Sequence, residues 1–133
     1  MRSSVTPKTI RRLLAADGYL HLELPGQAVA ELNKIDNAGA LEGPRQLLLG
    51  ISLKRAGDAA AATTHLEAAA RLMPGSVRNF AWSELAECYR ESGSDELADF
   101  AESLGGKKSY ELRIALPFGE ISVESTNATH EIA

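Results

Sequence analysis

Hydrophobic residues recur over the first three quarters of the chain at spacings of three and four, which is the period of a helix buried on one face. Groups of glycine, proline and small polar residues interrupt this pattern repeatedly, from Leu24-Pro25-Gly26 to Gly105-Gly106. The segments between them predict helices over residues 6–23, 26–36, 42–56, 58–72, 77–92 and 94–104. Because the connections are short, consecutive helices should pair antiparallel, which gives three helical hairpins.

The C-terminal part of the chain changes to a period of two. Apolar residues alternate with polar or small ones on both sides of the turn signal Pro117-Phe118-Gly119, which predicts a β-hairpin over residues 109–124. Its apolar positions are Tyr110, Leu112, Ile114, Leu116, Ile121 and Val123. A lone hairpin is marginal in water, so this face should pack on the end of the third helical hairpin, on a groove of the helices, or on another chain. The tail is thus expected to be a cap or a self-association element, with a disordered end at residues 125–133.

The helical hairpins also repeat in sequence. Small residues five positions into each second helix, Ala28, Ala62 and Ala98, lie 34 and 36 residues apart. The third unit reads Trp82-x-x-Leu85-Ala86-x-x-Tyr89 and has Gly93 at its turn. Helix–turn–helix content at a period of 34 is typical of the tetratricopeptide repeat, and the chain resembles that family over residues 5–104.

The resemblance implies an all-α fold, a right-handed α-α superhelix of three helical hairpins followed by the β-hairpin-like tail. Its units would span about residues 9–38, 43–75 and 78–104 within a domain of residues 1–106, and residues 107–133 would form the extension. Four residues depart from the family pattern. Arg12, Gln46 and Glu102 replace large apolar residues, and Glu23 replaces a turn glycine. A two-residue shift at the start of the third unit is assigned to a loop over residues 74–79.

In this family the first helix of each pair lines a concave groove. The resemblance therefore assigns to the groove Ile10, Leu13, Asp17, Leu20, His21, Leu47, Ile51, Lys54, Phe80, Ser83, Glu87 and Arg90. This lining is apolar at one edge and charged at the other, which suits a peptide with a few apolar anchors. The alternative is that the apolar members are covered by the tail or by a second copy of the chain. A clamp for carboxylate-ended peptides is not expected. Lys54 and Arg90 are the only cations assigned to the groove, and Asp17 and Glu87 oppose an anionic ligand.

The expected function is that of a protein–protein interaction adaptor or scaffold, with a protein or peptide partner in the groove. A small dedicated chaperone of the secretion type, which shields apolar client segments, is the alternative. A homodimer that forms through the C-terminal tail is a further expectation. These expectations rest on the resemblance, because fold-level analogy supplies binding and no named partner.

Composition and charge narrow the range of functions. The chain has 21 alanines and 18 leucines, which favour helices, and a net charge of −4, which argues against nucleic acid as a partner. Its acidic stretch Glu84–Glu102 is expected to be the solvated face of two helices. No apolar run approaches the roughly 20 residues that cross a bilayer, so no membrane partner is expected. A cytoplasmic location is expected, with a transit peptide over the basic residues 1–16 as the alternative to a helix opened by Thr6-Pro7.

The spacing of the reactive residues does not indicate a catalytic site. His21, His65 and His130 lie far apart, and no group of residues has the spacing of metal ligands. Cys88 shares a column of small residues with Gly18 and Ser52, which indicates a packed structural thiol. We therefore expect no catalytic residue, no metal, no cofactor and no enzymatic activity.

Overall fold

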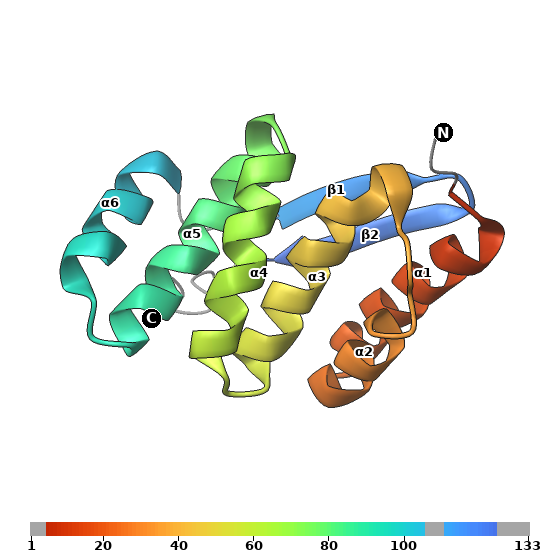
Figure 1. Ribbon diagram of the computed structural model, residues 1–133, viewed down its shortest axis with the longest axis horizontal. Coiled ribbons are helices and arrows are strands. Elements are labelled where there is room, and N and C mark those ends of the chain that lie inside the picture. The colour runs from red at the N-terminus through yellow and green to blue at the C-terminus, as the bar shows by residue number, and fades with distance from the viewer. Residues whose placement is uncertain (1–4, 106–110, 125–133) are drawn as a thin grey trace.

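The computed structural model describes residues 5–105 and 111–124, and within them helices predominate. The helices are α1 (Pro7–His21), α2 (Pro25–Leu32), α3 (Glu42–Arg55), α4 (Ala59–Leu72), α5 (Gly75–Glu91) and α6 (Asp95–Gly105), with a 3-10 turn, η1 (Gly39–Leu41), before α3. They form a row of antiparallel pairs, α1 with α2, α3 with α4 and α5 with α6, in which α2 also packs on α3 and α4 on α5 (Figure 1). The mostly helical prediction is thus confirmed.

The three pairs are closed by the same turn. At each turn an N–H donates to the carbonyl five residues earlier: Leu24 to Tyr19 at 2.8 Å, Asp58 to Leu53 at 2.9 Å and Ser94 to Tyr89 at 2.8 Å. The residue before each donor is left-handed, with φ of 62° at Glu23, 95° at Gly57 and 82° at Gly93. The backbone therefore repeats at the intervals of 34 and 36 residues that the sequence shows.

Three helix boundaries differ from the prediction by two residues or more, and one of them is the end of α1, at His21 instead of residue 23. Helix α2 ends at Leu32, four residues early, and the Asn37 side chain accepts the N–H of Gly39 at 2.9 Å in the loop that follows. Directly after α2 the N–H groups of Lys34 and Ile35 donate three residues back, to the carbonyls of Glu31 and Leu32, so the helix ends in a tighter turn. Helix α5 begins at Gly75, so the loop assigned to residues 74–79 is wrong and most of that segment is helical. Helix α1 begins as predicted, because Thr6 caps it by accepting the N–H of Thr9 at 3.1 Å.

Small residues allow the helices of a pair to approach closely. Ala28, Ala62 and Ala98 are fully buried. A Cβ added at Gly50 would lie 2.5 Å from Cγ of Leu66 in α4, so no side chain fits between α3 and α4 at this point. A larger residue there would overpack the seam.

The departures Arg12 and Gln46 form polar bridges between paired helices. Arg12 donates to Glu31 at 2.9 Å across the first pair, and Gln46 contacts His65 Nδ1 at 2.7 Å across the second. Both bridges join residues 19 apart in sequence. In the third pair the Trp82 and Phe100 rings meet edge-on at 6.0 Å instead. Polar contacts thus join the first two helix pairs, and an aromatic contact joins the third.

The predicted β-hairpin is present as β1 (Glu111–Leu116) and β2 (Gly119–Glu124), paired antiparallel. The register sets Leu112 opposite Val123 and Ile114 opposite Ile121, so the apolar residues share one face. The hairpin runs behind α3, between α5 and α1 (Figure 1). Of the tail residues named above, Tyr110 and residues 125–133 lie outside the described part of the chain.

Candidate functional site

The β-hairpin covers the side of the molecule formed by the first helices of the three pairs. We call this side, made by α1, α3 and α5, the hairpin face. The β2 strand packs mainly on α1 and the β1 strand contacts α5. The inner residues Leu112, Leu116, Ile121 and Val123 are buried, whereas Glu111, Arg113 and Glu120 on the opposite face of the sheet are exposed. The apolar face of the β-hairpin thus packs on helices of the same chain, α1 and α5.

Most residues assigned to the groove lie buried in the core of the hairpin face. Eight are buried: Ile10, Leu13, Asp17, Leu20, Leu47, Ile51, Phe80 and Ser83. Lys54 and Glu87 are largely covered, and His21 and Arg90 are exposed. The eight buried residues, together with Lys54 and Glu87, are thus covered, and the chain's own β-hairpin supplies part of that cover.

Within the described part of the chain, two hydrogen bonds join helix side chains to the main chain of the hairpin. Oδ1 of Asp17 accepts the N–H of Ser122 at 3.3 Å, and the Arg55 guanidinium donates to the carbonyl of Glu124 at 3.4 Å. Neither bond depends on the identity of the strand residue. The inner face of the hairpin is apolar, and the hairpin turn reaches α1, where a Cβ on Gly119 would lie 3.2 Å from Leu14.

The Asp17 carboxylate is largely withdrawn from water by the hairpin. Burial raises its pKa, although nearby His21 and the Ser122 N–H act in the opposite direction. The His21 ring stands 3.5 Å from Asp17 Oδ2 and 2.8 Å from its carbonyl oxygen. Protonation of Asp17 is therefore easier in the folded protein than in the unfolded chain.

A buried ion cluster lies at the charged edge of the hairpin face. Lys54 Nζ lies 2.9 Å from Glu84 and 2.8 Å from Glu87, and only 6% of the Lys54 side chain and 1% of the Glu84 side chain are exposed. Burial acts to lower the pKa of Lys54, but the attraction of Glu84 and the hydrogen bonds that Lys54 donates to both carboxylates outweigh it, so this pKa is raised. Because Lys54 already pairs with two carboxylates, it does not offer its positive charge to an anionic ligand.

Glu84 corrects the expectation that the acidic stretch is a solvated face. It is among the most buried side chains, and its Oε2 has no hydrogen-bond partner among the described residues. The spacing of four from Phe80 and from Cys88 is the signal that places it on an inward helix face. Its charge led the sequence analysis to assign it to solvent instead.

The other reactive residues remain apart. Burial raises the pKa of the Cys88 thiol to about 11, so this cysteine is a neutral thiol near pH 7. Burial and nearby Arg45 lower the pKa of His65, which contacts Gln46. Over residues 5–105 and 111–124 no three His, Cys, Asp or Glu side chains lie close enough to hold a metal ion, and no helix there is long and apolar enough to span a bilayer. His130 lies outside the described residues.

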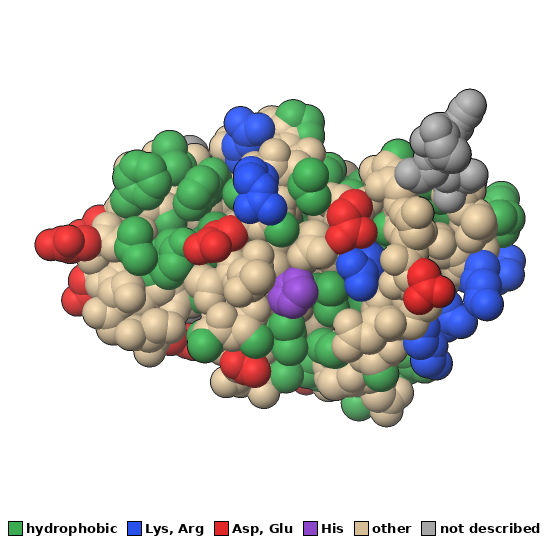
Figure 2. All heavy atoms as spheres, viewed as in Figure 1, with side chains coloured by type: hydrophobic (Ala, Val, Ile, Leu, Met, Phe, Trp, Pro, Cys, Tyr) green, Lys and Arg blue, Asp and Glu red, His purple; other side chains and the backbone are tan. Residues whose placement is uncertain are grey.

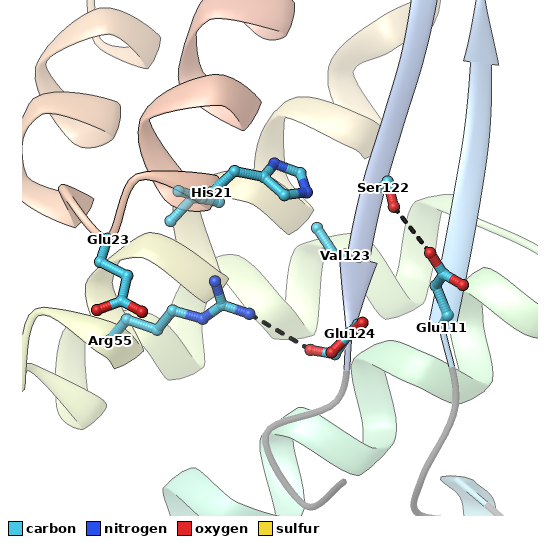
Figure 3. Close-up of a pocket in the computed structure, with 8 residues that line it drawn as sticks. His21, Glu23, Arg55, Glu111, Ser122, Val123 and Glu124 are labelled. Carbon is cyan, nitrogen blue, oxygen red and sulfur yellow. Dashed lines mark hydrogen bonds between the residues drawn. The ribbon is translucent and has the colours of Figure 1, made fainter. Parts of the chain in front are cut away.

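A polar hollow of about 290 Å³ opens where the strand ends meet the first two helix pairs (Figure 3). It is lined by Leu20, His21, Glu23, Arg55, Glu111, Ser122, Val123 and Glu124. In Figure 3 the side chains of Glu23 and Arg55 both lie on the helix side of the hollow. The dashed line from the Arg55 guanidinium ends on Glu124. Of these residues the sequence analysis had named only Leu20, His21 and Val123 as site residues, and Glu23 as a turn position.

The geometry describes a helical face that holds an amphipathic β-segment by apolar packing and main-chain hydrogen bonds. Comparison of the chain with protein-family models, with curated proteins and with solved structures finds no match.

Proposed function

We propose that this chain is a non-catalytic protein–protein interaction module of the tetratricopeptide-repeat type, whose hairpin face binds an amphipathic segment of a partner protein. The three identical turns at intervals of 34 and 36 residues support the repeat architecture and its superhelix. The buried neutral thiol of Cys88 is consistent with an inert cysteine and a cytoplasmic setting.

One observation carries the binding proposal: the face already holds a β-segment with alternating apolar residues. The resident hairpin buries Leu112, Leu116, Ile121 and Val123, while the helices contact its main chain at Ser122 and Glu124. A two-stranded hairpin has little stability of its own, so packing on the helices must provide most of the free energy that keeps it folded. A partner segment with the same alternation would use the same contacts after displacing it.

The mode of attachment also favours the second candidate, a small chaperone. The two helix–hairpin hydrogen bonds of the described residues, from Arg55 to Glu124 and from Ser122 to Asp17, involve backbone atoms of the hairpin, which every partner segment possesses. Recognition of this kind has low sequence preference, as shielding of many apolar client segments requires. An adaptor would instead need selectivity from the pockets that receive the apolar side chains.

The test releases the hairpin without shortening the chain. Ile121→Glu places a charge at a fully buried position of the inner face and should free the hairpin face. A labelled synthetic peptide of residues 109–124 should then bind this variant at least about tenfold more tightly than the wild type, whose face is occupied. The same peptide carrying its own Ile121→Glu is the matched control and should not bind.

A peptide array separates the candidate functions. Binding of one sequence class to the released variant supports the adaptor, and binding of many peptides with alternating apolar residues supports the chaperone. If the variant remains folded by circular dichroism and binds neither the tail peptide nor any array peptide, the hairpin face is not a partner site.

A further inference from the structure

The outer surface of α6 is apolar although this helix ends the row. Ala98 and Ala101 are buried, but Leu97, Phe100 and Leu104 are 51%, 57% and 41% exposed. These three residues follow the i, i+3, i+7 spacing and lie along one side of the helix. Terminal helices of repeat arrays need a polar outer face for solubility. Figure 2 shows hydrophobic side chains gathered over α6 and α5.

A shallow hollow beside α6 continues this apolar surface. The Trp82 ring meets Phe100 edge-on, and Trp82 also lines the hollow together with Ala70, Glu67, Arg71 and Arg78. We call Trp82, Leu97, Phe100 and Leu104 the end patch. It is distinct from the hairpin face, which α1, α3 and α5 present to the β-hairpin.

Opposite charges flank the end patch. Helix α6 carries Asp95, Glu96, Asp99 and Glu102 and no basic residue, and Asp99 and Glu102 each lie 3.1 Å from Arg90 of α5. The hollow carries Arg71 and Arg78, and Figure 2 shows basic side chains next to the hydrophobic group. Arg78 donates its Nε–H to the carbonyls of Ala70 and Met73, whereas Arg71 is exposed and has no ion pair with any residue in the described ranges.

We propose that the end patch is the interface of a two-fold homodimer, in which α6 of one copy lies in the arginine-edged hollow of the other. One face carries both complementary parts, an acidic helix with an apolar stripe and an apolar hollow with arginines. A two-fold axis brings each part against its complement twice, which is what an isologous interface requires. A foreign acidic helix would satisfy the hollow and leave the stripe of α6 exposed.

The first experiment measures the solution mass of the full chain by light scattering over a series of concentrations, together with the emission of Trp82, the single tryptophan of the sequence. We expect the mass to rise to twice the monomer value and the emission to shift to the blue as the indole becomes covered. Phe100→Glu and, independently, Leu97→Glu should leave a folded monomer, since both side chains are exposed in the single chain. Phe118→Glu, at a 65% exposed position on the hairpin turn, is the matched control and should still dimerise.

Salt dependence tests the charge pairing without assuming individual contacts. Salt should weaken the wild-type dimer, because it screens opposite charges. In Arg71→Glu the hollow faces an acidic helix with a like charge, so dimerisation should be weaker by roughly threefold or more, and salt should strengthen it. Arg11→Glu, an exposed arginine on α1, should leave both the affinity and its salt dependence close to the wild-type values.

Three outcomes would overturn the homodimer: a monomer at every concentration, a dimer that both Phe100→Glu and Leu97→Glu leave intact, or a dimer that Phe118→Glu dissociates. The last outcome would assign self-association to the tail. This proposal does not rest on partner binding at the hairpin face, so either can fail without the other.

Discussion

The hairpin face and the end patch are both apolar surfaces of the same row of helices, but among residues 5–105 and 111–124 the β-hairpin covers the first and not the second. Ile10, Leu13 and Phe80 on the hairpin face are buried, whereas Leu97 and Phe100 on the end patch are about half exposed. The β-hairpin that follows α6 in the chain packs on α1 and α5 (Figure 1). Distance along the chain therefore does not decide which surface a C-terminal segment protects.

The two surfaces also differ in how they hold charge. Lys54 lies between Glu84 and Glu87 in the interior, and Arg90 lies between Asp99 and Glu102 near α6, at 3.1 Å from each and in contact with solvent. Each cluster has one cation between two carboxylates. Only the buried one must compensate for the loss of hydration.

Removal of the two cations should give the largest difference between these regions. Lys54→Met leaves Glu84 buried without its cation and should lower the free energy of unfolding by about 3–5 kcal/mol. Arg90→Met should lower it much less, because solvent screens the exposed cluster. Urea denaturation of both variants checks this, and Lys54→Met combined with Glu84→Leu should recover most of the loss. Equal effects for the two single variants would contradict the contrast.

Truncation of one apolar residue from each surface gives the next largest effect. Ile121→Ala removes a fully buried side chain from the hairpin and should lower the free energy of unfolding by about 2–4 kcal/mol. Phe100→Ala, on the end patch, should lower it by less than about 1 kcal/mol when unfolding is measured at low protein concentration. At high concentration the loss for Phe100→Ala should increase if the end patch joins two copies.

Much of the fold could be predicted from the sequence because local patterns determine it. Thr6-Pro7 opens α1, the alternation of Leu112 with its neighbours forms a strand, and the turns at Gly57 and Gly93 share one geometry. What covers each apolar surface could not be predicted. A period of two shows that Ile121 and Val123 lie on one face, but it does not distinguish a groove, an end of the row and a second chain as the cover.

Charged residues were the other source of error. Glu84 occupies an inward helix position, where its burial depends on Lys54, a residue 30 positions earlier that no local pattern connects to it. Arg12 and Glu31 likewise stabilise the first helix pair through a bridge that replaces an apolar contact. Such pairs form only after the helices pack. A prediction from residue type alone therefore places these charged residues on the exposed surface.

A pH series should show how the hairpin affects the carboxylate that holds it. Because burial raises the pKa of Asp17 above its ordinary value of 3.8, the folded state binds the proton more readily than the unfolded chain does. The contribution of Asp17 to stability is thus complete below pH 3.8 and decreases as the pH rises through the raised pKa. Asp17→Asn retains an oxygen that accepts the Ser122 N–H and should lack this decrease, a difference of about 1 kcal/mol or less.

The control for Asp17 lies on the exposed side of the molecule. Asp99→Asn, whose side chain is largely exposed beside Arg90, should change the pH dependence of unfolding much less. Urea denaturation of the two variants and the wild type at each pH gives the comparison. A constant difference between the wild type and Asp17→Asn over this pH range would show that the hairpin does not perturb Asp17.

The smallest expected effect concerns the turn beside the polar hollow. Glu23 adopts the left-handed conformation that Gly57 and Gly93 adopt in the other two turns, and a residue with a Cβ is strained there by about 1 kcal/mol. Glu23→Gly should therefore raise the free energy of unfolding by about 0.5 kcal/mol, since glycine also gains freedom in the unfolded chain. Gly57→Ala and Gly93→Ala should each lower it by about 1 kcal/mol. If Glu23→Gly is destabilising instead, the side chain outweighs the strain through its position near Arg55, and the hollow then helps to join the helices to the hairpin.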